Sequence, residues 1–167
     1  RDDTNIKGIS PYIETEALIK SKTAVAGVLV NGVIASKDKS VSVIHEFMQT
    51  GNFEKIQTSN NIVLGRLLAR KLNVDVGDKI SLMLPDTSSS FAGYFPKSKV
   101  FNISGIFNIG SKDIDETLAY ISLENASILT GLKNQVHGFR LKFDDLFEAP
   151  YLVWQSLIYA EKNSNVL

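Results

Sequence analysis

A polar loop bracketed by two prolines, Pro85 and Pro96, separates two stretches of the chain that alternate like β-strands. Apolar side chains alternate over residues 80–84 before the loop and over residues 101–107 after it. Because proline fixes φ at both ends and serines solvate the middle, we expect the loop to project from a firm sheet. A long irregular loop inside a compact domain is usually functional or disordered. The sequence therefore makes this loop the first candidate for a functional site.

Three aromatic rings, Phe91, Tyr94 and Phe95, lie in this loop, whose polar composition gives them no obvious means of burial. As anchors in a hydrophobic partner, each ring would bury about 150–250 Å². Rings that fold back on their own sheet are the alternative. Backbone groups of the loop can also pair with the edge of a partner's sheet. We interpret the loop as a protein-binding element rather than a catalytic one.

Composition narrows the class of protein. The chain has 167 residues, 44% of them hydrophobic, which fits one globular unit or two small subdomains. Eighteen basic residues balance eighteen acidic ones, so no overall field favours nucleic acid. The absence of cysteine excludes disulfides, thiolate metal sites and thiol nucleophiles. The longest apolar stretch, residues 24–35, is shorter than the roughly 20 residues that cross a bilayer. The chain starts without methionine, which suggests an excised fragment.

Short strands and short helices alternate along the chain without a fixed period. Strands are expected at 9–19, 24–34, 62–65, 80–84, 100–107, 118–123 and 136–143. Helices are expected from Ser40 to a stop at Gly51, over 66–72 up to Asn73, over 124–130 up to Gly131, and over 150–162 from Pro150. Residues 110–116 are expected to form a polar connection. This order predicts an α+β fold with mixed sheets and short helices.

Other side chains suggest chemistry only weakly. An acidic cluster, Asp113, Asp115 and Glu116, has carboxylates that suit a cation or acid–base pair, but it lacks the glycine-centred loop of an EF-hand. We expect it to be a solvated loop. Asp144 and Asp145 are expected to favour the N-terminus of the last helix. Two histidines, His45 and His137, lack further metal-binding partners, so we expect both to be structural and predict no metal, cofactor or catalytic site.

Several motifs run in the order found in one family. They are Pro11-Tyr12-Ile13-Glu14, the glycine-bounded stretch 27–33, the 62–69 stretch Ile-Val-Leu-Gly-Arg-Leu-Leu-Ala, the 72–80 stretch ending in Gly-Asp-Lys-Ile, the loop exit 93–101, and Gly105-Ile106-Phe107. On these motifs the chain resembles the lipoprotein-releasing ABC permeases of the LolC/LolE type, whose external domain belongs with the MacB-like periplasmic core domains. The two-proline loop is similar to the LolC side specifically.

The resemblance implies a division of the chain. A porter-like subdomain would comprise 1–36 and 113–167, truncated at its N-terminus, and a Sabre-like subdomain would comprise 37–112. The loop 85–96 falls at the family's Hook, and Lys99 falls where the family places a basic residue of the adjoining Pad. Ser81 stands where a second basic Pad residue is expected, which weakens the electrostatic part of the resemblance.

The family's function would then be lipoprotein release from the bacterial inner membrane, with this chain as a non-enzymatic periplasmic domain. The resemblance implies recruitment of the soluble lipoprotein chaperone of the LolA type. Other implied partners are a separate LolD-type ATPase, a second permease subunit and the lipoprotein substrate. The partner-binding residues would be Pro85, Phe91, Gly93, Tyr94, Phe95 and Pro96, with Lys97 and Lys99 supplying positive charge.

Alternatives remain for these residues and for the function. A solvated strand edge guarded by lysine explains Lys97 and Lys99 equally well. A MacB-like external domain of another exporter would use the same scaffold for a different periplasmic partner. A hydrolase would use Asp113, Asp115 or the pair Asp144-Asp145, and it requires a concave pocket in which carboxylates have raised pKa values.

Overall fold

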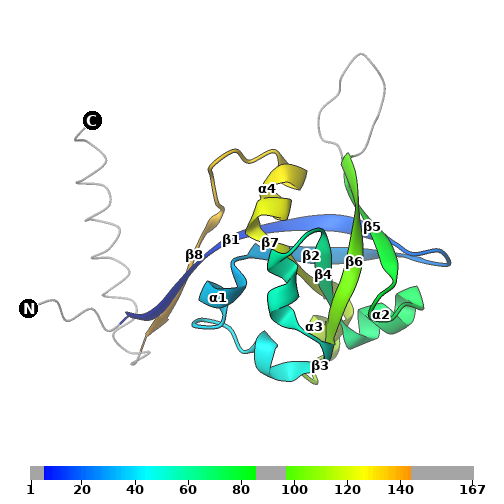
Figure 1. The fold of residues 1–167 in the computed structure, drawn as a ribbon, viewed down its shortest axis with the longest axis horizontal. Helices are drawn as coiled ribbons and strands as arrows, with labels where there is room; N and C mark the ends of the chain where they lie inside the picture. Colours follow the sequence, from blue (N-terminus) through cyan, green and yellow to red (C-terminus); the bar gives the residue numbers. More distant parts are fainter. Residues whose placement is uncertain (1–5, 86–96, 144–167) are drawn as a thin grey trace, which may run out of the picture.

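The computed structural model describes residues 6–85 and 97–143 (Figure 1). Its strands are β1 (Ile6–Lys20), β2 (Val25–Val33), β3 (Met48–Gly51), β4 (Asn61–Gly65), β5 (Lys79–Leu84), β6 (Lys97–Phe107), β7 (Leu118–Ser122) and β8 (Gly138–Phe143). The α-helices are α1 (Ala35–Asp38), α2 (Arg66–Leu72), α3 (Lys112–Thr117) and α4 (Leu123–Thr130), and the 3₁₀ helices are η1 (Ile44–Phe47) and η2 (Phe53–Gln57). Within the described ranges, no helix has the length and apolar character needed to cross a bilayer.

Six of the strands close into a ring. The hydrogen-bonded order is β1, β2, β7, β4, β6, β5 and back to β1, while β3 adds to β6 and β8 adds to β1. The β2–β7 and β4–β6 pairs are parallel and the other pairs are antiparallel. The predicted α+β fold with a mixed sheet and short helices is confirmed. Closure also leaves the barrel strands few free edges.

The main core lies on one face of all six ring strands, where inward side chains converge. Fully buried members include Ile13 and Ile19 of β1, Leu82 of β5 and Phe101 and Ile103 of β6. Helices α2 and α4 add Leu68, Leu72 and Leu129 to the same cluster. Because alternate strand residues face inward, the period-2 pattern of the sequence becomes this core.

A second, smaller core covers part of the opposite face of the sheet. Phe53 of η2 and Phe107 of β6 both meet the ring of Tyr120 edge-on, with centroid separations of 5.6 and 5.9 Å. Edge-to-face contact is a favourable arrangement for aromatic rings. Burial raises the pKa of the Tyr120 hydroxyl to about 12. This cluster fastens the segment from α1 to η2 onto the sheet.

Helix ends follow the sequence in α2 and α4. Asn73 ends α2 in the left-handed region with φ of +52°, and Gly131 ends α4 with φ of +76°. The Ser122 side chain caps α4 by accepting from the Asn125 N–H at 3.1 Å. Both helices end where the sequence predicts, because their stop residues tolerate positive φ, whereas α4 begins one residue before its predicted start. The predicted helix 150–162, with Pro150, lies outside the described residues.

Two segments differ from the prediction. The predicted helix from Ser40 to Gly51 is wrong: residues 44–51 form η1 and then β3, and the Ser40 hydroxyl donates to the Lys37 carbonyl at 2.7 Å instead of capping a helix. Pairing of β3 with β6 prevails over the apolar helical spacing. The predicted polar connection at 110–116 is also wrong, because residues 112–117 form α3.

The sheet joins segments from both predicted subdomains. Strands β4, β5 and β6 come from 37–112, whereas β1, β2, β7 and β8 come from the flanking parts. The division into 1–36 with 113–167 and 37–112 stays a prediction.

Candidate functional site

The proline-bracketed loop is mounted on an antiparallel hairpin of β5 and β6. The pairs run without a break from Lys79 and Asn102 to Leu84 and Lys97. Figure 1 shows this hairpin rising beyond the barrel. At its base, Ile80 and Phe101 are buried in the main core. The predicted firm base for the loop is therefore present.

The structure describes three of the eight predicted partner-binding residues. These are Pro85, Lys97 and Lys99, which lie at the stem. The other five, Phe91, Gly93, Tyr94, Phe95 and Pro96, lie outside the described residues.

Pro85 marks the end of the pairing between β5 and β1. The register, with Lys20 opposite Ser81 and Leu18 opposite Met83, would place Pro85 opposite Glu16. The ladder ends at Leu18 and Met83, and Pro85, which has no N–H to donate, cannot extend it. On the same edge of β1, pairing with β8 reaches only as far as Tyr12. Within the described ranges, the edge of β1 between these two ladders has no strand beside it.

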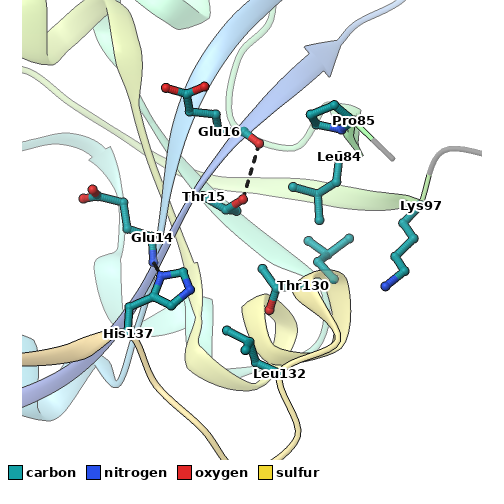
Figure 2. A pocket seen from close by; sticks show the side chains of 10 residues that line it. Glu14, Thr15, Glu16, Leu84, Pro85, Lys97, Thr130, Leu132 and His137 are labelled. Carbon is teal, nitrogen blue, oxygen red and sulfur yellow. Dashed lines mark hydrogen bonds between the residues drawn. The ribbon is translucent and has the colours of Figure 1, made fainter. Parts of the chain in front are cut away.

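A groove of about 520 Å³ lies along this interrupted edge (Figure 2). It is lined by Glu14, Thr15 and Glu16 of β1, by Leu84, Pro85 and Lys97 of the stem, by Leu129, Thr130 and Leu132 of α4 and the residues after it, and by His137. Lys97 and His137 stand on opposite sides of the groove in Figure 2. Two predicted partner-binding residues, Pro85 and Lys97, thus line this one groove at the foot of the loop.

His137 completes the edge of β1 with its side chain. Its Nδ1 accepts a hydrogen bond from the Glu14 N–H at 3.1 Å, and its own N–H donates to the Tyr12 carbonyl at 3.0 Å. Nδ1 must therefore be unprotonated in this arrangement. The geometry agrees with the structural role expected for His137.

Lys97 is exposed at the top of the stem. Its Nζ lies 3.1 Å from the position that a Cβ on Gly131 would occupy, next to the C-terminus of α4. A cation is favourable there because the helix end carries partial negative charge. Among the described residues, no carboxylate forms an ion pair with Lys97 or Lys99.

Lys99 is half-buried and held by a neutral partner. Its Nζ donates to Oδ1 of the buried Asn125 at 2.6 Å and lies 5.9 Å from the centroid of the Phe101 ring. Asn125 in turn donates from Nδ2 to the Ser59 carbonyl at 3.2 Å. The amide does not cancel the charge of Lys99, but it connects β6 to α4 and to the segment before β4. Sequence reasoning missed Asn125, since no local pattern links residues 26 positions apart.

Ser81 does not share a face with the two lysines. It pairs with Val100, whereas Lys99 pairs with Leu82 and Lys97 with Leu84. Successive side chains of a strand point to opposite faces of the sheet. Any side chain at position 81 therefore points away from the face that carries Lys97 and Lys99.

Two of the three carboxylates in the acidic cluster of α3 have partners within the fold. The buried carboxylate of Asp115 accepts from the Ile109 N–H at 2.9 Å and from the Gly110 N–H at 3.0 Å. Glu116 pairs with Lys71 at 3.3 Å, and Asp113 is exposed. The expectation of a solvated loop is thus wrong for Asp115. Asp144 and Asp145 lie outside the described residues. In the described ranges, no three His, Asp or Glu residues are placed to hold a metal ion.

A polar cluster around Arg140 of β8 was not predicted. The guanidinium contacts Asp38 Oδ1 at 3.4 Å and Glu14 Oε2 at 3.8 Å, donates to the Asn31 side chain, and lies 4.7 Å from the centroid of the Tyr12 ring. Burial raises the pKa of Asp38, and the charge of Arg140 opposes that rise. The cluster fastens β8 to the barrel.

Comparison with known proteins finds relatives along most of the chain, although no family model matches. The chain is 32% identical over 148 residues to "Lipoprotein-releasing system transmembrane protein LolC" of Xylella fastidiosa, covering 88% of this chain and 35% of that protein. The LolC protein of Neisseria meningitidis is 30% identical to the chain, and the match covers 96% of this chain and 40% of that protein. The LolE protein of Haemophilus influenzae is also 30% identical, and the match covers 89% of this chain and 36% of that protein. The chain spans between a third and two fifths of the length of these relatives.

Solved structures share the fold at low sequence identity. The extracellular domain of the ABC-type transporter YknZ from Gram-positive bacteria has a TM-score of 0.63 at 9% identity, covering 90% of this chain and 72% of that one. The periplasmic region of MacB from Actinobacillus actinomycetemcomitans has a TM-score of 0.57 at 11% identity, covering 99% and 79%. These two external domains have the same fold as the chain described above.

Proposed function

We propose a function from one premise: the chain belongs to the LolC/LolE family of lipoprotein-releasing ABC permeases and has the fold of MacB-like external domains. The chain would act as the periplasmic domain of such a permease in a bacterial inner membrane. Its loop 85–96 would recruit the LolA-type chaperone that accepts the released lipoprotein. The porter-like and Sabre-like division at 37 and 112 is part of this proposal.

The stem of the loop carries the proposal. Six residue pairs join β5 to β6, and the buried Phe101 fixes the base of the hairpin in the barrel core. Pro85 has no N–H with which to extend the ladder of β5 along β1, which ends at Met83. A loop on so firm a support can be presented in one direction, which lowers the entropy cost of binding.

The loop and the stem would contribute different terms to binding. Phe91, Tyr94 and Phe95 would be the apolar anchors of the contact. Lys97 and Lys99 would attract an acidic surface of the chaperone, because neither is paired with a carboxylate among the described residues. Charges at the rim change the association rate and its salt dependence more than the final affinity.

The remaining partners follow from the family rather than from contacts in this domain. A LolD-type ATPase, as a separate subunit, would supply the energy, and a second permease subunit would complete the membrane part. This domain would have no catalytic step of its own. Its task would be to hold the chaperone near the lipoprotein as it leaves the membrane.

Titration of the chain with the LolA-type chaperone of the same organism tests the proposal. The matched variant replaces residues 86–95 with a short glycine turn and keeps Pro85, Pro96 and the stem. A control variant, Thr50→Ala, changes an exposed residue of β3 at the other end of β6. The expected result is binding by the parent chain and the control but none by the loop variant. Equal binding by all three would refute recruitment through the loop.

A second candidate function is that of a MacB-like external domain serving another periplasmic partner. The observation that favours it is the structural likeness to the periplasmic region of MacB. That function predicts no affinity of the parent chain for the chaperone. The same titration therefore distinguishes the two.

A further inference from the structure

The outer face of β1 and β2 is bare near the foot of the loop. Leu18 and Val25 are 47% and 53% exposed, and both lie on this outer face. Gly27 of β2 pairs with Leu18 of β1, so it stands between these side chains. Exposed apolar side chains scattered singly are ordinary, so these two point to a contact surface only together with the space beside them.

Neither the backbone conformation at position 27 nor the packing around it requires a glycine. Its φ lies outside the left-handed region, and a Cβ added to it would meet no atom within 4 Å. Glycine weakens a strand interior, and where it occurs it often marks a place that another molecule approaches closely. The described residues supply no neighbour that would explain it. The missing side chain leaves open space on the outer face.

This space is a shallow hollow of about 630 Å³. Its walls include Leu18, Gly27, Leu29 and Pro85, and Glu16 is the one charged residue in its lining. Pro85 also lines the groove beneath the loop. The hollow is therefore continuous with the foot of the stem and is mainly apolar.

We propose that this hollow receives a large apolar side chain of the same chaperone that the loop 85–96 recruits. The inference rests on the proposed function and adds a second, fixed contact point to it. The hollow shares Glu16 and Pro85 with the groove at the foot of the loop, so a partner held by the loop would lie over it. Anchoring side chains fill apolar pockets that the interface covers, so the hollow would take one once the chaperone lies over it.

Filling the hollow tests the inference. Gly27→Leu places a side chain where Gly27 leaves space, and the open surroundings predict a folded protein at least as stable to heat as the parent chain. The expected result is chaperone binding weaker by about tenfold or more, in line with the loss of one anchor. Gly27→Ala should weaken binding less. The matched control, Thr50→Leu, adds an exposed leucine to β3 and should bind like the parent chain.

Each outcome has one meaning. Loss of binding on replacement of residues 86–95 together with parent-like binding by Gly27→Leu would overturn the hollow and leave the proposed function intact. Parent-like binding by the loop variant would overturn both. Should Gly27→Leu unfold, Leu18→Ser is used instead, and its parent-like affinity would equally overturn the inference. Sedimentation of the parent chain as a dimer that Gly27→Leu converts to a monomer would assign the hollow to self-contact and overturn it too.

Discussion

Two glycines of β2, five residues apart and facing opposite sides of the sheet, show how differently the two ends of one strand are used. At Gly32 a Cβ would collide with the Cβ of Ala126, because α4 packs directly on the strand. At Gly27 the same Cβ would meet only open space. One glycine is required by the fold, and the other is left for a contact that the fold does not supply. A glycine in a strand pattern thus has two meanings that only the packing distinguishes.

The largest effect is expected at the covered end, where Arg140 holds β8. Arg140→Met removes the cation beside the buried Asp38 and breaks the contact with Asn31 of β2. Removing one partner of a buried pair costs about 3–5 kcal/mol, and the half-exposed guanidinium places this case at or below the lower end. Urea unfolding at neutral pH measures the loss. A variant as stable as the parent would show that β8 is held by its ladder alone.

Next in size is Gly32→Ala. The added methyl group has to displace α4, which should cost about 1–3 kcal/mol as overpacking of the core. Thermal or urea unfolding checks this value, with Gly27→Ala as the matched substitution in the same strand. Similar stabilities for the two variants would contradict the difference between the two ends.

The pH dependence of stability gives a further test of the packing at the covered end of β2. Burial raises the pKa of Asp38 above its ordinary value of 3.8, so the folded state binds this proton more tightly than the unfolded state. The contribution of Asp38 is then most favourable below pH 3.8 and is lost as pH rises through the raised folded pKa. Asp38→Asn should remove this decrease. Unfolding curves between pH 3.5 and 7 on both proteins measure it, and parallel curves would contradict the assignment.

The smallest effect is expected at the bare end. Gly27→Ala should stabilise the chain by about 0.5 kcal/mol, because alanine restricts the unfolded chain and meets no neighbour in the fold. Differential scanning calorimetry can detect this change. A clear loss of stability would mean that a described neighbour fills the space after all.

The sequence predicted those parts of the fold that local patterns determine. Alternating apolar residues located β1, β2, β5 and β6, and the stop residues Asn73 and Gly131 located the ends of two helices. Closure of the barrel was not predicted, because β1 pairs with β2, β5 and β8 at once and no local pattern shows this. Residues 40–51 were misassigned because pairing of β3 with β6 overrides helical spacing.

The candidate site was predictable in position but not in its internal contacts. The prolines and strand alternation located the stem, and Pro85 and Lys97 do line one groove. The partner of Lys99 was not foreseen, since Asn125 reaches it only through the packing of α4. The pairing of Arg140 with Asp38 spans 102 positions in the sequence and depends on β8 joining β1.

Site-specific photo-crosslinking in the full permease tests the central claim most directly. A photo-reactive amino acid replaces Lys97 at the stem and, in a second protein, Thr50 at the opposite end of β6. During lipoprotein release, position 97 should crosslink to the LolA-type chaperone and position 50 should not. Equal crosslinking at both positions, or at neither while release continues, would contradict recruitment by this loop.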